Sequence, residues 1–148
     1  IAIGLIVWGR MAGKEVVTYW PDTTVECLSH GHENLSQHIH PSLVIFVNGA
    51  PEMVPANIGI NTACMAEVHT HDTTGKIHIE SVEAGKTFTL HDLSTVWGKS
   101  LEREGYEVSM TVDGTPSTEM GSLVLKDLQN IVLNYTSPTP AATVEVKI

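Results

Sequence analysis

Histidines spaced two residues apart are the feature of this sequence best suited to chemistry. The stretch "HTHDTTGKIHIE" holds three histidines within ten positions and a glutamate two residues further on: His69, His71, His78 and Glu80. The stretch "HIH" repeats the spacing with His38 and His40. Side chains two residues apart on a β-strand point the same way, so each pair offers two imidazoles to one point. Imidazole binds zinc, copper, nickel and iron. The spacing therefore predicts a metal site.

Carboxylates and further histidines lie close to these pairs in the sequence. Glu80 and Asp72 could bind the metal directly or hold the second ring nitrogen of a metal-bound histidine. His30 and His32 repeat the spacing within a softer polar stretch and are weaker candidates. His91 is expected on the surface, off the apolar stripe of a predicted helix. Copper or zinc fits this set, and sulfur from nearby methionines or Cys64 would favour Cu(I).

A β-hairpin is expected to carry the central histidines. Residues 64–72 and 75–81 both alternate in polarity, and "DTTG" lies between them. In an extended segment Ile77 and Ile79 share one face, whereas His78 and Glu80 share the other. The sequence predicts a strand pair with one apolar face and one face of imidazole and carboxylate.

The remaining elements predict a mostly β (α+β) fold, with an antiparallel, sandwich-like sheet and one short helix. Strands are expected at 15–20, at 43–49 before an Asn-Gly turn, and at 106–116, 131–136 and 142–148. Prolines keep the segment after residue 50 at a sheet edge. Helical spacing at 89–101 predicts a helix that begins at Thr89 and ends at Gly98. Residues 43–148 would form one β-rich globular domain, preceded by a polar, histidine-containing, irregular arm at 21–42.

The first nine residues, "IAIGLIVWG", carry no charge. A helix that spans a bilayer needs about 20 apolar residues, so this stretch alone is too short. It could be the end of an N-terminal membrane anchor, the end of a signal segment, or a leading strand. Trp8 with Arg10 and Lys14 resembles a membrane-interface boundary, which favours residues 1–20 as the end of an anchor.

Composition narrows the function classes. The chain has 148 residues and a formal net charge of -9, with only 8 Lys and Arg. Such a surface argues against nucleic acid and anionic lipid head groups as partners and fits one that attracts cations. Neither a Gly-rich phosphate loop nor a GxSxG motif is present.

Two cysteines, Cys27 and Cys64, do not form a CxxC pair. An even pair in an extracytoplasmic domain favours a disulfide, whose loop of this length contributes roughly 3–4 kcal/mol. Thiolate ligation of a metal beside the histidines is the other interpretation.

The runs "HIHPSLVIFVNGAPEMVPANIGI", "CMAEVHTHDTTGKIHIES" and "FTLHDLSTVWGKSL" resemble an uncharacterised family of membrane-anchored extracytoplasmic proteins. The family is common in archaea, including ammonia oxidisers, and occurs in some bacteria. Its pattern covers residues 38 to about 101 and falls on His38, His40, Cys64, His69, His71, Asp72, Gly75, His78 and Glu80. The sequence departs from the pattern at His91, where the family usually has Gly. The resemblance implies an N-terminal anchor and, by analogy with ammonia oxidisers, copper.

Three functions remain open on this basis. The first is an anchored extracytoplasmic domain that holds or delivers copper or zinc, or serves as an accessory subunit of a membrane complex such as a copper monooxygenase. The second is a structural subunit of a filament or envelope layer that self-assembles through the apolar N-terminal segment. The third is a zinc-dependent hydrolase or lyase with Glu80 or Asp72 as general base.

Overall fold

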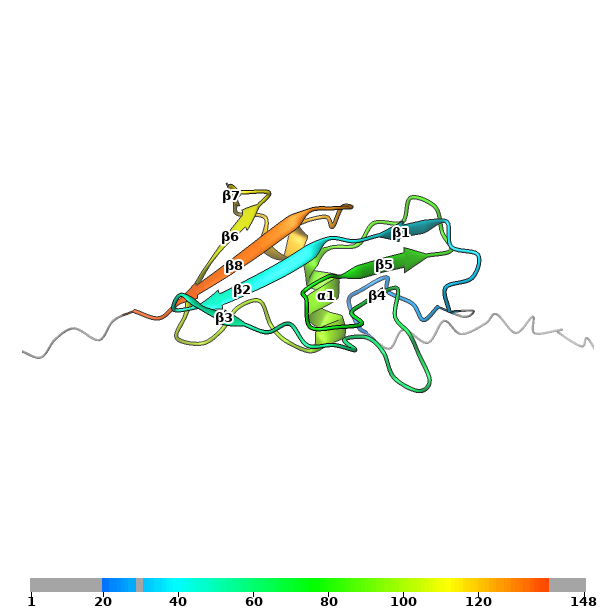
Figure 1. Cartoon of the computed structure of the whole chain (residues 1–148), viewed down its shortest axis with the longest axis horizontal. Coiled ribbons are helices and arrows are strands. Elements are labelled where there is room, and N and C mark those ends of the chain that lie inside the picture. The colour runs from blue at the N-terminus through cyan, green and yellow to red at the C-terminus, as the bar shows by residue number, and fades with distance from the viewer. Residues whose placement is uncertain (1–19, 29–30, 139–148) are drawn as a thin grey trace, which may run out of the picture.

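The computed structural model describes residues 20–28 and 31–138. Figure 1 shows two β-sheets, one after the other along the long axis of the molecule, with a single α-helix beside them. The mostly β class with one helix is confirmed. The displacement of the sheets along the long axis differs from the expected sandwich, in which two sheets stack face to face.

The larger sheet has five strands in the order β3-β2-β8-β6-β7. Their bounds are β2 Ser42–Val47, β3 Ala50–Glu52, β6 Glu107–Val112, β7 Thr115–Ser117 and β8 Asn130–Thr136. Two-residue turns at Asn48-Gly49 and Asp113-Gly114, all at positive φ, close the two hairpins at the expected places. Prolines keep β3 and β7 at the edges. The expectation of a wholly antiparallel sheet was wrong, because β2 and β8 pair in parallel.

The smaller sheet has three antiparallel strands in the order β1-β5-β4. They are β1 Gln37–Ile39, β4 Val68–His69 and β5 His78–Ser81. The predicted hairpin is confirmed, with His69 opposite His78. Val68, Ile77 and Ile79 are fully buried, as their predicted apolar face requires.

One continuous run of chain joins the sheets. β1 leads into β2 through His40 and Pro41 (Figure 1). The segment before β5 follows this run, because the Leu43 N–H donates to the Gly75 carbonyl at 2.9 Å. Gly75 has φ +84°, and a Cβ there would lie 2.2 Å from the Leu43 carbonyl oxygen. Only glycine allows this approach. Gly75 therefore permits the hydrogen bond that fixes the histidine hairpin against the first strand of the larger sheet, β2.

Helix α1 spans Leu90–Trp97 and lies close to β4 and to the short 3-10 helix η1 (Met120–Ser122). Thr89 caps its start in a capping box with Asp92, and Gly98 ends it at φ 73°. Leu90 and Leu93 enter the core that the sheets share, together with side chains such as Ile45, Phe88, Leu133 and Tyr135. The predicted caps and apolar stripe of the helix are confirmed. None of the helices in the described residues has the length and apolar character needed to cross a membrane.

The arm at 21–42 is less irregular than expected. Cys27 forms a bridge with Ala66 beside β4, and β1 forms within the arm. The Cys27–Cys64 disulfide, with a Cα–Cα distance of 5.3 Å, fastens the arm to the histidine hairpin. The predicted disulfide is therefore confirmed, and neither cysteine has a free thiol that could bind a metal. The strands expected at 142–148 and over most of 15–20, and the apolar segment at 1–9, lie outside the described residues.

Candidate metal centre

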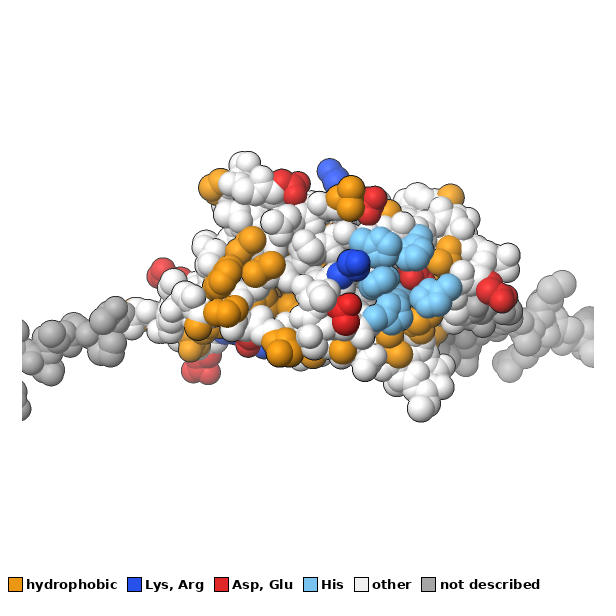
Figure 2. Space-filling model, in the orientation of Figure 1, with side chains coloured by type: hydrophobic (Ala, Val, Ile, Leu, Met, Phe, Trp, Pro, Cys, Tyr) orange, Lys and Arg blue, Asp and Glu red, His pale blue; other side chains and the backbone are white. Residues whose placement is uncertain are grey.

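Six histidines gather on one face of the molecule, over the smaller sheet. Ring-centroid distances of 4.6–6.3 Å link one to the next. Figure 2 shows them as a single patch. They come from two separate stretches of the sequence, residues 32–40 and 69–78: His32, His38, His40, His69, His71 and His78.

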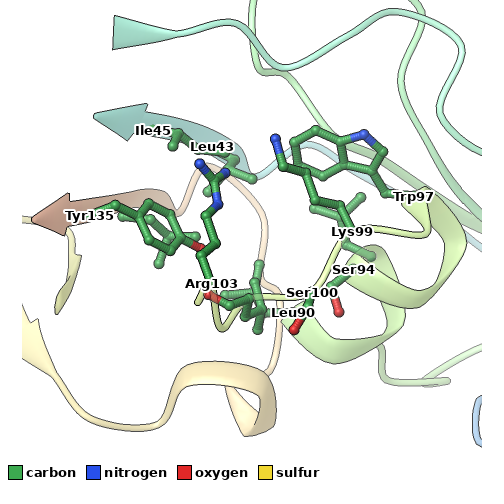
Figure 3. A pocket seen from close by; sticks show the side chains of 12 residues that line it. Leu43, Ile45, Leu90, Ser94, Trp97, Lys99, Ser100, Arg103 and Tyr135 are labelled. Atoms are coloured by element: carbon green, nitrogen blue, oxygen red, sulfur yellow. The ribbon is translucent and has the colours of Figure 1, made fainter. Parts of the chain in front are cut away.

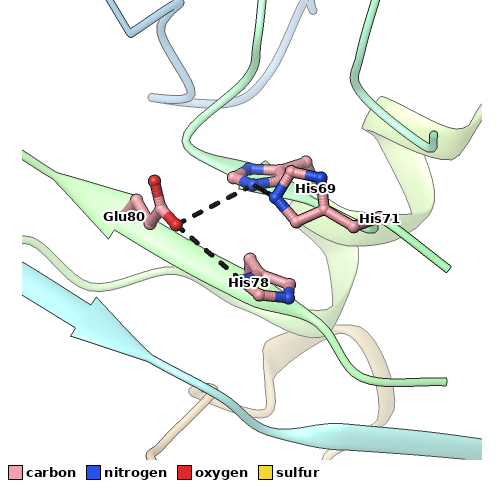
Figure 4. Close-up of side chains that lie close together, drawn as sticks. All are labelled: His69, His71, His78 and Glu80. Carbon is pink, nitrogen blue, oxygen red and sulfur yellow. Dashed lines mark hydrogen bonds and ion pairs between the residues drawn. The ribbon is translucent and has the colours of Figure 1, made fainter. Parts of the chain in front are cut away.

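Two sets of side chains within this patch have ligand atoms that all lie within 4.8 Å of one another. The inner group consists of His69, His71, His78 and Glu80, drawn in Figure 4. The outer group consists of His38, His40 and His78. Ligands around a tetrahedral zinc stand about 3.3 Å apart, given bond lengths of about 2.0–2.2 Å. Small side-chain rotations would bring either group to that spacing.

Glu80 is the centre of the patch. Its side chain is fully buried, yet all of its ion-pair partners among the described residues are histidines. Oε2 lies 2.7 Å from Nδ1 of His32. Oε1 lies 3.0 Å from Nε2 of His38, 4.0 Å from Nε2 of His69 and 3.8 Å from Nδ1 of His78.

Two atoms of the inner group are buried without a hydrogen-bond partner: Oε1 of Glu80 and Nδ1 of His78. A buried polar atom without a partner costs about 1–3 kcal/mol, and more if it is charged. Both atoms are metal ligands by type, and they face each other across 3.8 Å. A cation between them would satisfy both at once, so the donor set fits a metal ion.

The backbone fixes which nitrogen of His69 can bind a metal. Nδ1 lies 2.7 Å from the Ala66 carbonyl oxygen, and a carbonyl only accepts hydrogen bonds, so Nδ1 carries the proton. Nε2 is then unprotonated and points into the inner group. It lies 3.1 Å from Nε2 of His71, which donates to it in the metal-free protein. A carbonyl that sets the tautomer of a ligand in this way is typical of metal sites.

Burial and neighbouring imidazoles keep two of these rings neutral. The net pKa of His69 is lowered to about 4. Desolvation is the largest cause, and charge on His71 and His32 acts in the same direction, whereas the Ala66 carbonyl and Glu80 oppose the shift. Desolvation also lowers the pKa of His78 to about 4, aided by His71, His69 and His40. Both rings are therefore unprotonated at neutral pH, the form that binds metals.

The segment "VPANIGI" holds His69 and His71 in place through the residue between them. The Thr70 hydroxyl donates to the Pro55 carbonyl at 2.8 Å and accepts from the Ile58 N–H at 3.0 Å. Gly59 lies beneath the strand, where a Cβ would stand 2.7 Å from the Val68 carbonyl oxygen. The glycine permits the close approach, and the threonine fixes the direction of both imidazoles.

The structure brings most of the predicted site residues together. His69, His71, His78 and Glu80 form the inner group, and His38 and His40 join through His78. Asp72 belongs to neither group. It is exposed in the hairpin turn, where Oδ1 accepts from the N–H and hydroxyl of Thr74.

Sequence reasoning undervalued His32, which touches Glu80. The available signal was the disulfide, because a bridge at Cys27 carries residues 31 and 32 toward β4. His30 lies outside the described residues. His91 is exposed on α1, as expected.

A cavity lies between α1 and the larger sheet (Figure 3). Beside it Glu52 pairs with both Lys99 and Arg103, and the Tyr135 hydroxyl donates to the Leu101 carbonyl, whereas Nε of Arg103 is buried without a hydrogen-bond partner. The cavity volume is about 10 Å³, which is room for one water molecule. We assign the ion pairs and the hydrogen bond beside this cavity a structural role.

No family model matches this chain, and no curated protein or solved structure matches it. The resemblance of its motifs to the extracytoplasmic family stays a prediction.

Proposed function

We propose that this protein is an extracytoplasmic domain that holds one copper or zinc ion in the inner group and makes it available for delivery. The observation that carries the proposal is the buried Glu80 carboxylate, whose Oε1 has no hydrogen-bond partner and faces an equally unpartnered Nδ1 of His78. His69 and His71 complete the donor set.

The ligand chemistry narrows the metal to two candidates. Three imidazoles and one carboxylate suit Zn²⁺ and Cu²⁺. Cys27 and Cys64 are joined to each other, so no thiolate favours Cu(I). At a given nitrogen and oxygen site Cu²⁺ binds more tightly than Zn²⁺, which is why we name copper first.

The disulfide supports a location outside the cytoplasm, since such bonds persist in oxidising compartments. An N-terminal membrane anchor that ends within residues 1–20, and service as an accessory subunit of a membrane complex such as a copper monooxygenase, are parts of the proposal that rest on the sequence pattern alone. Fractionation of the native cells tests the anchor: the protein should stay with washed membranes and leave them only with detergent.

The hydrolase and filament functions have less support. A hydrolase would need a carboxylate free to act as a base beside the metal, whereas Glu80 lies among the donors and Asp72 is held by Thr74. The segment that a filament would use lies outside the described residues.

Elemental analysis of protein purified without added metal tests the proposal. We expect one copper or zinc ion per chain in the native protein, and loss of the ion in a His69→Ala/His71→Ala variant. His91→Ala is the matched control, because His91 is an exposed histidine outside both groups. Metal-free native protein with an intact fold would refute the proposal.

A further inference from the structure

The outer group lies beside the inner group and shares His78 with it. Its other members are accessible: the His38 side chain is 46% exposed and His40 is half-buried. In the inner group Glu80 and His69 are completely buried. The inner group also reaches solvent at His71, which is exposed, but the outer group offers an ion from solvent three imidazoles none of which is buried.

The shared histidine prevents both groups from being complete at once. A neutral imidazole has one unprotonated nitrogen, so His78 can bind only one ion at a time. Charge also disfavours filling both groups at once. Two divalent ions side by side would repel each other, and the two groups together contain a single carboxylate, Glu80.

A difference in charge between the two groups favours movement of a bound ion from the outer group to the inner group. The outer group contains only imidazole ligands, and the charges around His40 oppose one another, Lys76 against Asp127 and Glu80. The inner group adds the negative charge of Glu80 in a buried setting, where attraction to a cation is stronger than in water. An ion held by the outer group therefore moves downhill in free energy toward the inner group.

We infer that the outer group is the port through which the metal ion enters and leaves the inner group. This inference rests on the proposed function. The ion first exchanges water for His38, His40 and His78. It then keeps His78 while His69, His71 and Glu80 replace the two outer imidazoles. The oxidation state does not change. When Nε2 of His71 takes the ion, the proton that it held toward His69 passes through solvent to Nδ1 of the same ring, so no net proton is released.

His38 links the two steps. Its Nε2 lies 3.0 Å from Oε1 of Glu80, the oxygen that the ion must take in the inner group. The two atoms are close but form no hydrogen bond, so an ion bound to His38 already lies next to the oxygen that it must take. The outer group thus brings the ion up to the inner group.

A port and a ligand of the final site have different kinetic signatures. Removal of a port residue slows loading and release by the same factor and leaves the equilibrium affinity unchanged, because both directions use the same path. Removal of a final ligand lowers the affinity mainly through faster release.

The test uses Zn²⁺ as the probe, since zinc has no redox chemistry. Calorimetric titration gives the number of ions per chain, and stopped-flow exchange with a fluorescent zinc chelator gives loading and release rates. His40→Ala probes the outer group alone: the backbone N–H of His40, not its ring, bonds to Asp127. His71→Ala probes the inner group at an exposed position, and His91→Ala is the control.

We expect one zinc per wild-type chain. In His40→Ala, loading and release should both slow at least tenfold, with affinity within threefold of wild type. In His71→Ala, affinity should fall at least tenfold with an undiminished loading rate. Circular dichroism of each metal-free variant verifies the fold.

Three outcomes would overturn the inference. Two tightly bound ions per wild-type chain would show that the groups fill independently. Wild-type rates in His40→Ala would show that the ion enters elsewhere. Lower affinity in His40→Ala at unchanged loading would make His40 a ligand of the final site. In each of these cases metal binding as the function would stand, with two ions per chain in the first case and His40 among the ligands in the third, whereas absence of zinc and copper binding to the wild type would remove both.

Discussion

Two glutamates in hydrogen-bonded neighbouring segments are buried to the same degree but have opposite surroundings. Glu67 is 3% exposed and Glu80 is 0% exposed, and the Glu80 N–H donates to the Glu67 carbonyl at 2.8 Å. The Glu67 carboxylate accepts from Ser81, from the Glu26 N–H and from Lys86 at 2.7 Å. Glu80 has only imidazoles around it.

The difference separates a structural carboxylate from a binding one. A buried charge is costly unless it is paired and hydrogen-bonded. Lys86 supplies that pairing for Glu67 within the fold. The side chains around Glu80 are all imidazoles, which are metal ligands, so a cation that they bind would balance its charge. Substitution of either glutamate by glutamine tests this distinction.

The largest effect is expected at Glu67. Glu67→Gln leaves the largely buried Lys86 ammonium without its closest anionic partner, and loss of one member of a buried pair costs about 3–5 kcal/mol. Urea denaturation should show this loss in the free energy of unfolding, and metal content should remain one ion per chain. Exposed Glu83→Gln is the control. Loss of metal from a folded Glu67→Gln protein would place Glu67 in the metal centre.

The second largest effect on the free energy of unfolding should come from bound metal, which stabilises the native state. A ligand present at 100 times its dissociation constant adds about 2.7 kcal/mol. Thermal unfolding with zinc and with a chelator should therefore show a higher midpoint with zinc, in the wild type and in Glu67→Gln alike. Equal midpoints for the wild type under both conditions would contradict the account.

Glu80→Gln should have the reverse profile of Glu67→Gln. Removal of the charge from the inner group should weaken zinc binding at least tenfold, which corresponds to about 1.4 kcal/mol. The metal-free variant should be as stable as the wild type or more so, because a buried charge without a cationic partner is gone. Competition titration and urea denaturation measure the two quantities. A large loss of stability in the metal-free protein with unchanged affinity would make Glu80 a structural residue.

Mild acid should lower the stability of the metal-free protein. Burial lowers the pKa of His69 and of His78 to about 4, from an ordinary 6.5. The unfolded chain therefore takes up protons at a pH where the native rings do not. Stability is full above pH 6.5 and declines as the pH falls toward 4. His78→Gln should flatten this decline between pH 6.5 and 4, and a slope equal to that of the wild type would contradict it.

Local patterns in the sequence were enough to predict the histidine hairpin, the long strands of the larger sheet, two turns and the helix ends, but not β1. The Asn48-Gly49 turn, the Thr89 cap and the alternation around Ile77 and Ile79 each depend on residues close together in the chain. The His-x-His pairs at His69 and His38 likewise pointed to a metal site from spacing alone.

What could not be predicted depends on distant contacts. The parallel pairing of β2 with β8 joins segments more than 80 residues apart, and alternation does not encode the direction of a partner strand. Glu67 and Glu80 are the same residue type in neighbouring segments, and contacts with distant residues, Lys86 above all, distinguish them. The approach of His32 to Glu80 follows from the Cys27–Cys64 disulfide, whose effect on the arm has no local signal.

X-ray diffraction from crystals of zinc- or copper-loaded protein, recorded at the absorption edge of the metal, tests the central claim most directly. The account predicts one anomalous peak per chain about 2.0–2.2 Å from nitrogens of His69, His71 and His78 and from Oε1 of Glu80. A peak with Glu80 outside its coordination shell, or no peak over the smaller sheet, would contradict it.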